Sequence, residues 1–481
     1  MWSWLTKTVF SVVAALLVAK ALQVISRVMR TGGKFPDAPS SRKNWFFGHA
    51  LELSDPAKRV DIIDGWCEAV GTCEFRALSR RALVITEVED VAKLSSLRPR
   101  TVQRSPLMRT LCDYFAPGVF TAEVPQWTVE RRIVSPAFHS NARLSEYVPN
   151  IVKLSERLCE VVAGKEVAIN ATMNKFTLDS IGLLGFGQDI DTLRGGDDDA
   201  AMFTSCFAIL AKRLMAPLPY CKLIPYFGER MDGGKARQRA LFQFLEDVVR
   251  RGGPDRTVLA KLLEKNLGEN NALTDERLVG NLATLFLAGT DTTGTTITWM
   301  VKHLAEDSTL QEEARIEARR FANRPDDFGT VPLLRSLFRE VLRMEGPVAV
   351  LPLQNTTEPV VIAGRTVDPN EYTLIVALRF LGKHRLPPGE KDPTKFDAWR
   401  WVDRKEKDGL RPWPKALMPF GFGVRACPGK DLSELEALIA VGALLRRFEM
   451  TLVDDGKGPH GAKFAFTMIP SREIYVNFHP I

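Results

Sequence analysis

The chain has 481 residues, 45% hydrophobic and 26% charged, and its 65 basic residues outnumber its 58 acidic residues to give a net charge of +7. This composition is typical of a large globular protein and excludes disordered, collagen-like and disulfide-stapled chains. Seven basic residues and one acidic residue precede position 44, so the rest of the chain is nearly neutral, which argues against a nucleic-acid-binding domain.

Residues 1–30 are expected to form an N-terminal membrane anchor. Positions 8–19 (TVFSVVAALLVA) are uncharged, and the apolar run continues past Lys20 to Arg27. A membrane span needs about 20 apolar residues, and this segment is long enough if one of its lysines extends to the membrane interface. Trp2 and Trp4 would also fit at that interface. The basic residues after the run predict a cytoplasmic position for the domain that follows. A cleaved signal peptide and an acid-free organelle presequence are the alternatives.

The anchor is followed by a Pro-containing linker, predicted over 31–48, and by a single body over 49–481. Most of this body shows apolar residues at helical spacings of three and four, and strand patterns are few and short. The fold class expected is therefore mainly α with small β-sheets. Helices are predicted over 144–163, 237–251, 275–306 and 432–448, and strands over 84–86, 358–363, 373–377 and 473–478.

The first motif in chain order is Trp127-Thr-Val-Glu-Arg131. A tryptophan and an arginine four residues apart share one face of a helix, so they can together bind a carboxylate. In isolation the pair is a weak indication, because aromatic and basic residues often share a helix face for packing alone.

The predicted helix 275–306 contains the motif Ala288-Gly-Thr-Asp291-Thr292. An aspartate and several threonines argue against a membrane span, whereas a helix buried through a protein core tolerates them. Threonine hydroxyls can bond the carbonyl one turn back, and an acid beside a hydroxyl is a plausible proton relay. A buried structural aspartate with local hydrogen bonds is the alternative.

Glu340-Val-Leu-Arg343 lies in a strongly amphipathic helix that begins near Pro332. A Glu-x-x-Arg spacing usually marks only a solvated salt bridge, and the same spacing occurs at Glu312/Arg315 and Glu317/Arg320. Only the pair Glu340/Arg343 lies in an apolar helix between the other motifs, so it is the candidate for a buried network.

One of the seven cysteines, Cys427, stands in a glycine-rich segment just before the predicted helix 432–448. The dipole and free N–H groups of a helix start favour a thiolate, which is what a persistent metal ligand requires. The segment Phe420-x-x-Gly423-x-Arg425-x-Cys427-x-Gly429 resembles the haem-binding loop of the cytochrome P450 family. The other motifs occur in that family's chain order, and the resemblance extends over about 35–481.

The resemblance implies roles for individual residues. Cys427 would be the iron ligand of haem b, within a loop that includes Phe420 and Gly429. Trp127, Arg131 and Arg425 would bind haem, Asp291 and Thr292 would deliver protons, and Arg400 would join Glu340 and Arg343 in a structural network. The substrate pocket would include Ala288, Val348, Val350, Phe464 and Phe466. The implied fold is the cytochrome P450 fold, preceded by the anchor.

Three positions depart from the family pattern. Trp399 replaces the usual glutamate before Arg400, and Gly346 replaces the usual proline after the Glu-x-x-Arg helix. Leu353 or Gln354 stands where many relatives have a propionate-binding arginine, so propionate binding is expected to depend more on Trp127, Arg131 and Arg425.

The implied activity is insertion of one oxygen atom from O2 into a lipophilic substrate, such as a fatty acid, sterol, terpenoid or carotenoid. The chain has no room for a flavin or nicotinamide domain, so electrons from NADPH would arrive through a membrane-bound flavoprotein reductase. The expected location is the endoplasmic reticulum membrane with the body facing the cytosol, or another organelle membrane. A haem-thiolate isomerase or peroxygenase, and a non-catalytic membrane-anchored haem or lipid-binding protein, are the alternatives.

Overall fold

The computed structural model describes residues 33–196 and 232–481, with short pieces between 202 and 213. Within these ranges it omits 41–43, 79, 139–140, 252–253, 271, 323–330, 352–353, 388–390, 404, 407–408 and 465–466. The predicted anchor lies outside the described residues. No helix in the described ranges is both long enough and apolar enough to cross a bilayer.

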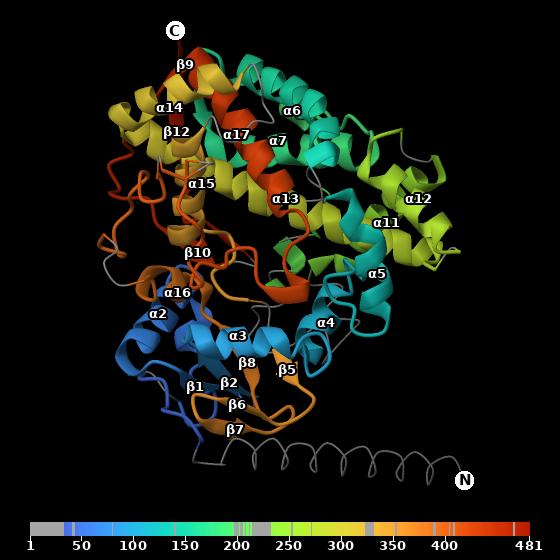
Figure 1. Ribbon diagram of the computed structural model, residues 1–481, viewed down its shortest axis with the longest axis vertical. Coiled ribbons are helices and arrows are strands. Elements are labelled where there is room, and N and C mark those ends of the chain that lie inside the picture. The colour runs from blue at the N-terminus through green and yellow to red at the C-terminus, as the bar shows by residue number, and fades with distance from the viewer. Residues whose placement is uncertain are drawn as a thin grey trace, which may run out of the picture.

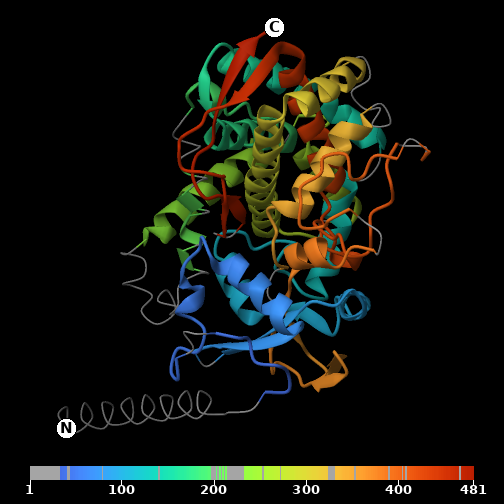
Figure 2. The same cartoon turned by 90° about the vertical axis from the view of Figure 1, so that its left-hand side faces the viewer.

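Helices dominate the structure and form its larger part, as Figures 1 and 2 show. Their bounds are α2 Arg59–Val70, α3 Val88–Ser96, α4 Pro106–Cys112, α5 Gln126–Val134, α6 Asn141–Val162, α7 Ile169–Ser180, α11 Gly234–Arg251, α12 Val258–Gly268, α13 Asp275–Glu306, α14 Ser308–Phe321, α15 Pro332–Met344, α16 Leu378–His384 and α17 Lys430–Arg447.

Helix α13 runs through the centre of the helical part (Figure 2). Thr274 caps its start by accepting a hydrogen bond from the N–H of Arg277, and Asp275 and Glu276 place negative charge on the first turn. The helix packs against α7, α11 and α17, and most of its residues are buried. A helix buried on nearly all sides explains why its sequence is apolar without being a membrane span.

The strands form small sheets, the largest with the order β1-β2-β8-β5-β3 at the opposite end from most helices (Figure 1). Strands β2 and β8 are parallel, and the other neighbours in this sheet are antiparallel. The bounds are β1 Cys73–Ala77, β2 Arg80–Ile85, β3 Val102–Arg104, β4 Glu166–Ala168, β5 Gln354–Thr356, β6 Val360–Ile362, β7 Arg365–Val367, β8 Thr373–Val376, β9 Phe448–Leu452, β10 Ala462–Phe464, β11 Met468–Pro470 and β12 Tyr475–Pro480.

The mainly α class with small sheets is confirmed, and the observed helices α6, α11, α13 and α17 match the predicted ones to within three residues at each end. The described part of the predicted linker 31–48 packs against the folded body. Phe35 and Ala38 are buried, and the N–H of Ala38 donates to the carbonyl of Glu74 at 2.8 Å. The edge of β1 offers free backbone groups to this segment, so the folded body begins before residue 49.

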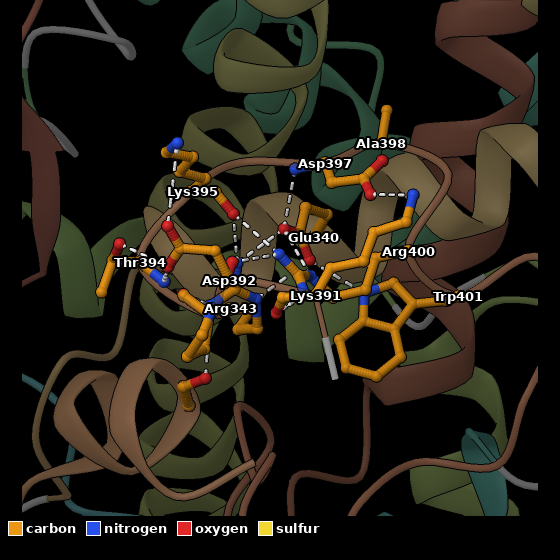
Figure 3. A network of polar contacts seen from close by, with 12 residues as sticks. Glu340, Arg343, Lys391, Asp392, Thr394, Lys395, Asp397, Ala398, Arg400 and Trp401 are labelled. Atoms are coloured by element: carbon orange, nitrogen blue, oxygen red, sulfur yellow. Dashed lines mark hydrogen bonds and ion pairs between the residues drawn. The ribbon is translucent and has the colours of Figure 1, made fainter. Parts of the chain in front are cut away.

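A buried ionic network joins α15 to the segment 391–401 (Figure 3). The carboxylate of Glu340 accepts from Arg343 Nη2 at 2.6 Å and from Arg400 Nε at 3.1 Å, and the side chains of all three residues are fully buried. Trp401 Nε1 and the N–H of Asp397 also donate to this carboxylate, each at 3.0 Å. The predicted grouping of Glu340, Arg343 and Arg400 is therefore present in the structure.

The two arginines of this network use their remaining N–H groups on backbone carbonyls. Arg400 donates to the carbonyls of Lys391, Asp392 and Lys395 at 2.8 to 2.9 Å, and Arg343 donates to that of Lys395 at 3.0 Å. The network thus holds a loop that has no regular secondary structure of its own. Trp399 braces the same loop from outside, because its Nε1 donates to Glu313 at 2.8 Å.

The variant Glu340→Gln is expected to lower the free energy of unfolding by about 3–5 kcal/mol, because two arginines would remain buried without their counter-charge. Urea denaturation followed by circular dichroism measures the effect. The matched control is Glu312→Gln, which breaks another Glu-x-x-Arg pair at a carboxylate that is 55% exposed. It is expected to cost less than about 1 kcal/mol. Equal losses in the two variants would contradict the prediction.

Candidate active site

The loop that carries Cys427 is closed by its own backbone. The N–H of Cys427 donates to the carbonyl of Phe420 at 2.8 Å. Gly421 and Gly423 have φ of 71° and 63°, in the left-handed region that other residues rarely adopt. Gly429 is the N-cap residue of α17, so Cys427 lies immediately before this helix as predicted.

The Cys427 thiol lines a large cavity and is accessible from it. Burial within the protein raises the pKa of the thiol, and the N–H of Gly429 and the charge of Arg131 oppose this rise. The predicted stabilisation of the thiolate by the start of α17 is present, but burial has the larger effect on the pKa of the thiol. A persistent thiolate here therefore needs a cation directly against the sulfur, as a metal ion would provide.

No group of three His, Cys, Asp or Glu side chains in the described ranges could hold a metal ion. A porphyrin supplies four nitrogen ligands in one plane, so that a single protein thiol can complete the coordination of its metal from one side. The donor set of a single thiol facing a large cavity fits haem.

The predicted haem-contacting side chains all line the same cavity as Cys427. Arg131 donates to the carbonyl of Ala426 at 2.9 Å, which ties α5 to the loop. The Arg425 guanidinium lies 4.6 Å from the ring centre of Trp127. Arg425 also donates to the carboxylate of Glu123 and to the carbonyl of Ala122, so its charge is already paired. Arg425 therefore contributes less to propionate binding than the sequence suggested, because Glu123 already balances its charge.

Two further arginines, Arg98 and Arg104, complete the positive end of the cavity. Both are buried, and Arg98 Nε and Arg104 Nη1 have no hydrogen-bond partner among the described residues. Burial and the neighbouring charge of Arg425 lower the pKa of Arg98 to about 10. Burial likewise lowers the pKa of Arg104, with Arg98 and Arg425 adding to the effect. Such buried, under-satisfied cations fit an anionic group, and haem carries two propionates.

Sequence reasoning missed Arg98 and Arg104. They lie on a loop and at the end of β3, outside every motif, so no local pattern marks them. Many family members have an arginine at the position of Leu353 or Gln354. Here Arg98 and Arg104 bring positive charge to the same cavity from a different segment.

The predicted relay residues come from the middle of α13. Thr292 lines the cavity, and its hydroxyl donates to the carbonyl of Ala288 at 2.7 Å. The carboxylate of Asp291 accepts a hydrogen bond from the Thr467 hydroxyl, in the turn between β10 and β11. Burial raises the pKa of Asp291, and this hydrogen bond opposes the rise. The sequence did not indicate Thr467 as a partner.

The cavity has a volume of about 820 Å³ and apolar walls. Four of the five predicted pocket residues line it, namely Ala288, Val348, Val350 and Phe464. The fifth, Phe466, lies outside the described residues. The cavity therefore joins the Cys427 loop, α13 and the β10–β11 hairpin around one space.

Glu436 on α17 is a buried acid of this cavity that the sequence did not single out. Its Oε1 has no hydrogen-bond partner in the described part of the chain. Burial raises the pKa of Glu436 to about 8, opposed by the nearby hydroxyl of Ser180 on α7. Near neutral pH the group is therefore largely protonated.

A raised carboxyl pKa makes the folded state hold a proton that the unfolded state has lost. Stability should then fall as the pH rises from about 4.3, the unfolded value, to about 8. Glu436→Gln should remove this contribution and raise the melting temperature at pH 8 by about 2 °C relative to the wild type, with little difference at pH 5. Calorimetry at the two pH values measures this, and a shift of equal size at both would contradict it.

Comparison with known families gives a match to the cytochrome P450 family model over residues 38–478. The mitochondrial sterol 26-hydroxylase of Mus musculus is 27% identical, over 75% of this chain and 72% of its own length. Leukotriene-B4 omega-hydroxylase 3 of the same species is 25% identical over 73% and 71%. Cytochrome P450 monooxygenase 205 of Postia placenta is 26% identical over 92% and 90%.

Proposed function

The chain belongs to the cytochrome P450 family, and we propose that it oxidises a lipophilic substrate in the cavity beside Cys427. Its class as a monooxygenase is supported by the family and by relatives that are hydroxylases. The single observation that carries the site assignment is that Cys427, the buried arginines and the centre of α13 all line one cavity.

In this proposal Cys427 is the iron ligand of haem b, and the arginines beside Trp127 bind the propionates. Arg98 and Arg104 add to Arg131 and Arg425 in that task. When bound, a thiolate-ligated haem supplies the activation of O2 and the oxidation of a C–H or C=C bond. One oxygen atom of O2 enters the substrate and the other leaves as water, which consumes two electrons and two protons.

The residues of α13 move the protons in this scheme. Asp291 is the half-buried acid, and the adjacent Thr292 hydroxyl is exposed to the cavity, where its oxygen can accept and pass on a proton. The helix holds both residues in fixed positions because α7 and α17 pack against it. A fixed acid beside a fixed hydroxyl is suited to directed proton transfer.

The substrate class follows from the walls of the cavity. The side chains Val348, Val350 and Phe464 are apolar, and an apolar cavity of this size favours a lipophilic molecule with few polar groups. Two of the similar proteins are named for a sterol and a leukotriene. We propose a fatty acid, sterol, terpenoid or carotenoid as substrate. A retained N-terminal anchor would place the enzyme at an organelle membrane, where such substrates partition.

The reduced, CO-bound absorption spectrum tests the haem assignment. The wild-type holoenzyme should show its Soret band at the position typical of thiolate ligation, and Cys427→Ala should lose that band because no other side chain replaces the sulfur. Cys206→Ala, at a buried cysteine outside the cavity, is the matched control and should leave the band unchanged. A thiolate-type band that survives in Cys427→Ala would exclude Cys427 as the ligand.

Electrons are proposed to come from NADPH through a flavoprotein reductase that docks on the Cys427 face. Lys415 and Lys430 lie near the loop in sequence, with Lys415 exposed and Lys430 half-buried 5.5 Å from the Trp413 ring centre. Arg132 also lies near this face in the proposal, but its guanidinium pairs with Glu269 at 3.1 Å, so its charge contributes less.

The double variant Lys415→Glu/Lys430→Glu is expected to slow haem reduction by the reductase by about tenfold at low salt, because rim charges act mainly on the association rate. Stopped-flow reduction under CO measures the rate. The control is Lys165→Glu, at an exposed lysine beside β12 near the opposite end of α17 from Lys430, which should leave the rate unchanged. A rate unaffected by the double variant would rule out docking through these lysines.

A further inference from the structure

The acid of the proposed relay is held by a residue outside its own helix. The hydroxyl of Thr467 donates to Oδ2 of Asp291, although the two residues are 176 positions apart in the chain. Thr467 is 6% exposed and lines the cavity together with Thr292. Among the described residues no lysine, arginine or histidine forms an ion pair with Asp291. The Thr467 hydroxyl is therefore the polar group that faces this carboxylate.

The position of the Thr467 hydroxyl is fixed by the hairpin on which it lies. In this β10–β11 hairpin Phe464 is paired with Met468, and the N–H of Met468 donates to the carbonyl of Pro347 at 2.8 Å. The N–H of Phe464 donates to the carbonyl of Pro56 at 2.9 Å. The hairpin is thus tied to two other segments, one of which leads into Val348 in the cavity wall.

We propose that Thr467 is a positioning residue for the proton relay: its hydroxyl fixes the carboxyl group of Asp291 and stabilises the ionised form. This inference rests on the proposed function, in which Asp291 delivers protons. It links the relay on α13 to the hairpin that carries Phe464, so the wall of the substrate pocket also sets the state of the acid.

Among the described residues, the charged groups on elements that pack near Asp291 make no ion pair with its carboxylate. On the packed elements, Asp179 of α7 accepts hydrogen bonds from Thr192, Glu436 of α17 faces Ser180, and Glu449 of β9 is exposed. Lys463 is half-buried on β10. Burial raises the pKa of Asp291, and the hydrogen bond from Thr467 is the single interaction that lowers it. Loss of that bond leaves the effect of burial unopposed.

The experiment compares holoenzymes carrying Thr467→Val, Thr467→Ser and Asp291→Asn with the wild type. Valine keeps the shape of threonine without the hydroxyl, and serine keeps the hydroxyl. Infrared difference titration follows the carboxyl C=O band that disappears in Asp291→Asn. Hydrogen peroxide formed per NADPH oxidised, with a flavoprotein reductase and no added substrate, is measured across the same pH range.

In Thr467→Val the titration of the Asp291 band should move upward by about one pH unit, since loss of a hydrogen bond to the ionised carboxylate lowers its acid dissociation constant by about tenfold. The pH profile of peroxide yield should move in the same direction, and Thr467→Ser should restore both. Unchanged titration in Thr467→Val, or a serine variant that behaves like valine, would overturn the proposal.

The same variants separate this inference from the proposed function. If Asp291→Asn alters the peroxide yield while Thr467→Val matches the wild type, Asp291 remains the relay and the role of Thr467 is wrong. If Asp291→Asn leaves the peroxide yield at the wild-type value, the relay itself is wrong, and the role of Thr467 falls with it.

Discussion

The buried carboxylate of Glu340 is the interaction on which the arrangement around the cavity depends. It is the one anion between Arg343 and Arg400, and those arginines in turn bind the carbonyls of a loop that has little regular structure. Leaving any member of such a cluster unpaired is costly, so the loop and α15 must assemble together. The same helix carries Phe338, whose ring stacks on Phe420 at 6.4 Å, at the start of the Cys427 loop. The network is therefore linked to the Cys427 loop through α15 and the contact between these two rings.

Basic, apolar and acidic side chains occupy different parts of the cavity and its surroundings. Arginines gather near the Cys427 loop, apolar side chains form the walls, and the acid Glu436 lines the cavity beside the hydroxyl of Ser180. Asp291 is half-buried next to the lining residue Thr292, and its carboxylate accepts from the Thr467 hydroxyl. Isolated acids in such surroundings resist ionisation, whereas clustered arginines favour an anion. The cavity thus separates a site for carboxylates of a cofactor from sites where protons can be held, and it does so with few polar groups.

The sequence predicted features that depend on residues close together in the chain, and it did not predict features that tertiary contacts create. Helical periodicity gave α6, α11, α13 and α17, and the Cys427 motif has a fixed spacing that needs no structure to recognise. Spacing does not distinguish Glu340/Arg343 from Glu312/Arg315, but the apolar helix around Glu340 does, and the structure buries Glu340 fully while Glu312 is 55% exposed. Arg98, Thr467 and Glu436 lie in no motif, because each acquires its role from residues distant in the chain. Short strands such as β3 and β5 depend on their partners in the same way.

The threonines of α13 illustrate how composition can mislead about the surface that a substrate meets. The hydroxyls of Thr284, Thr290, Thr292, Thr296 and Thr298 each donate to the carbonyl one turn earlier in the same helix. Thr284 and Thr296 also line the cavity, and a hydroxyl bound to its own helix leaves the methyl group more available to a neighbouring molecule. Hydrophobicity scales score these two positions as polar, yet a guest molecule would touch mainly hydrocarbon there. A threonine hydroxyl of this helix is fully available to water or substrate only where a stronger acceptor replaces its hydrogen bond to the backbone carbonyl.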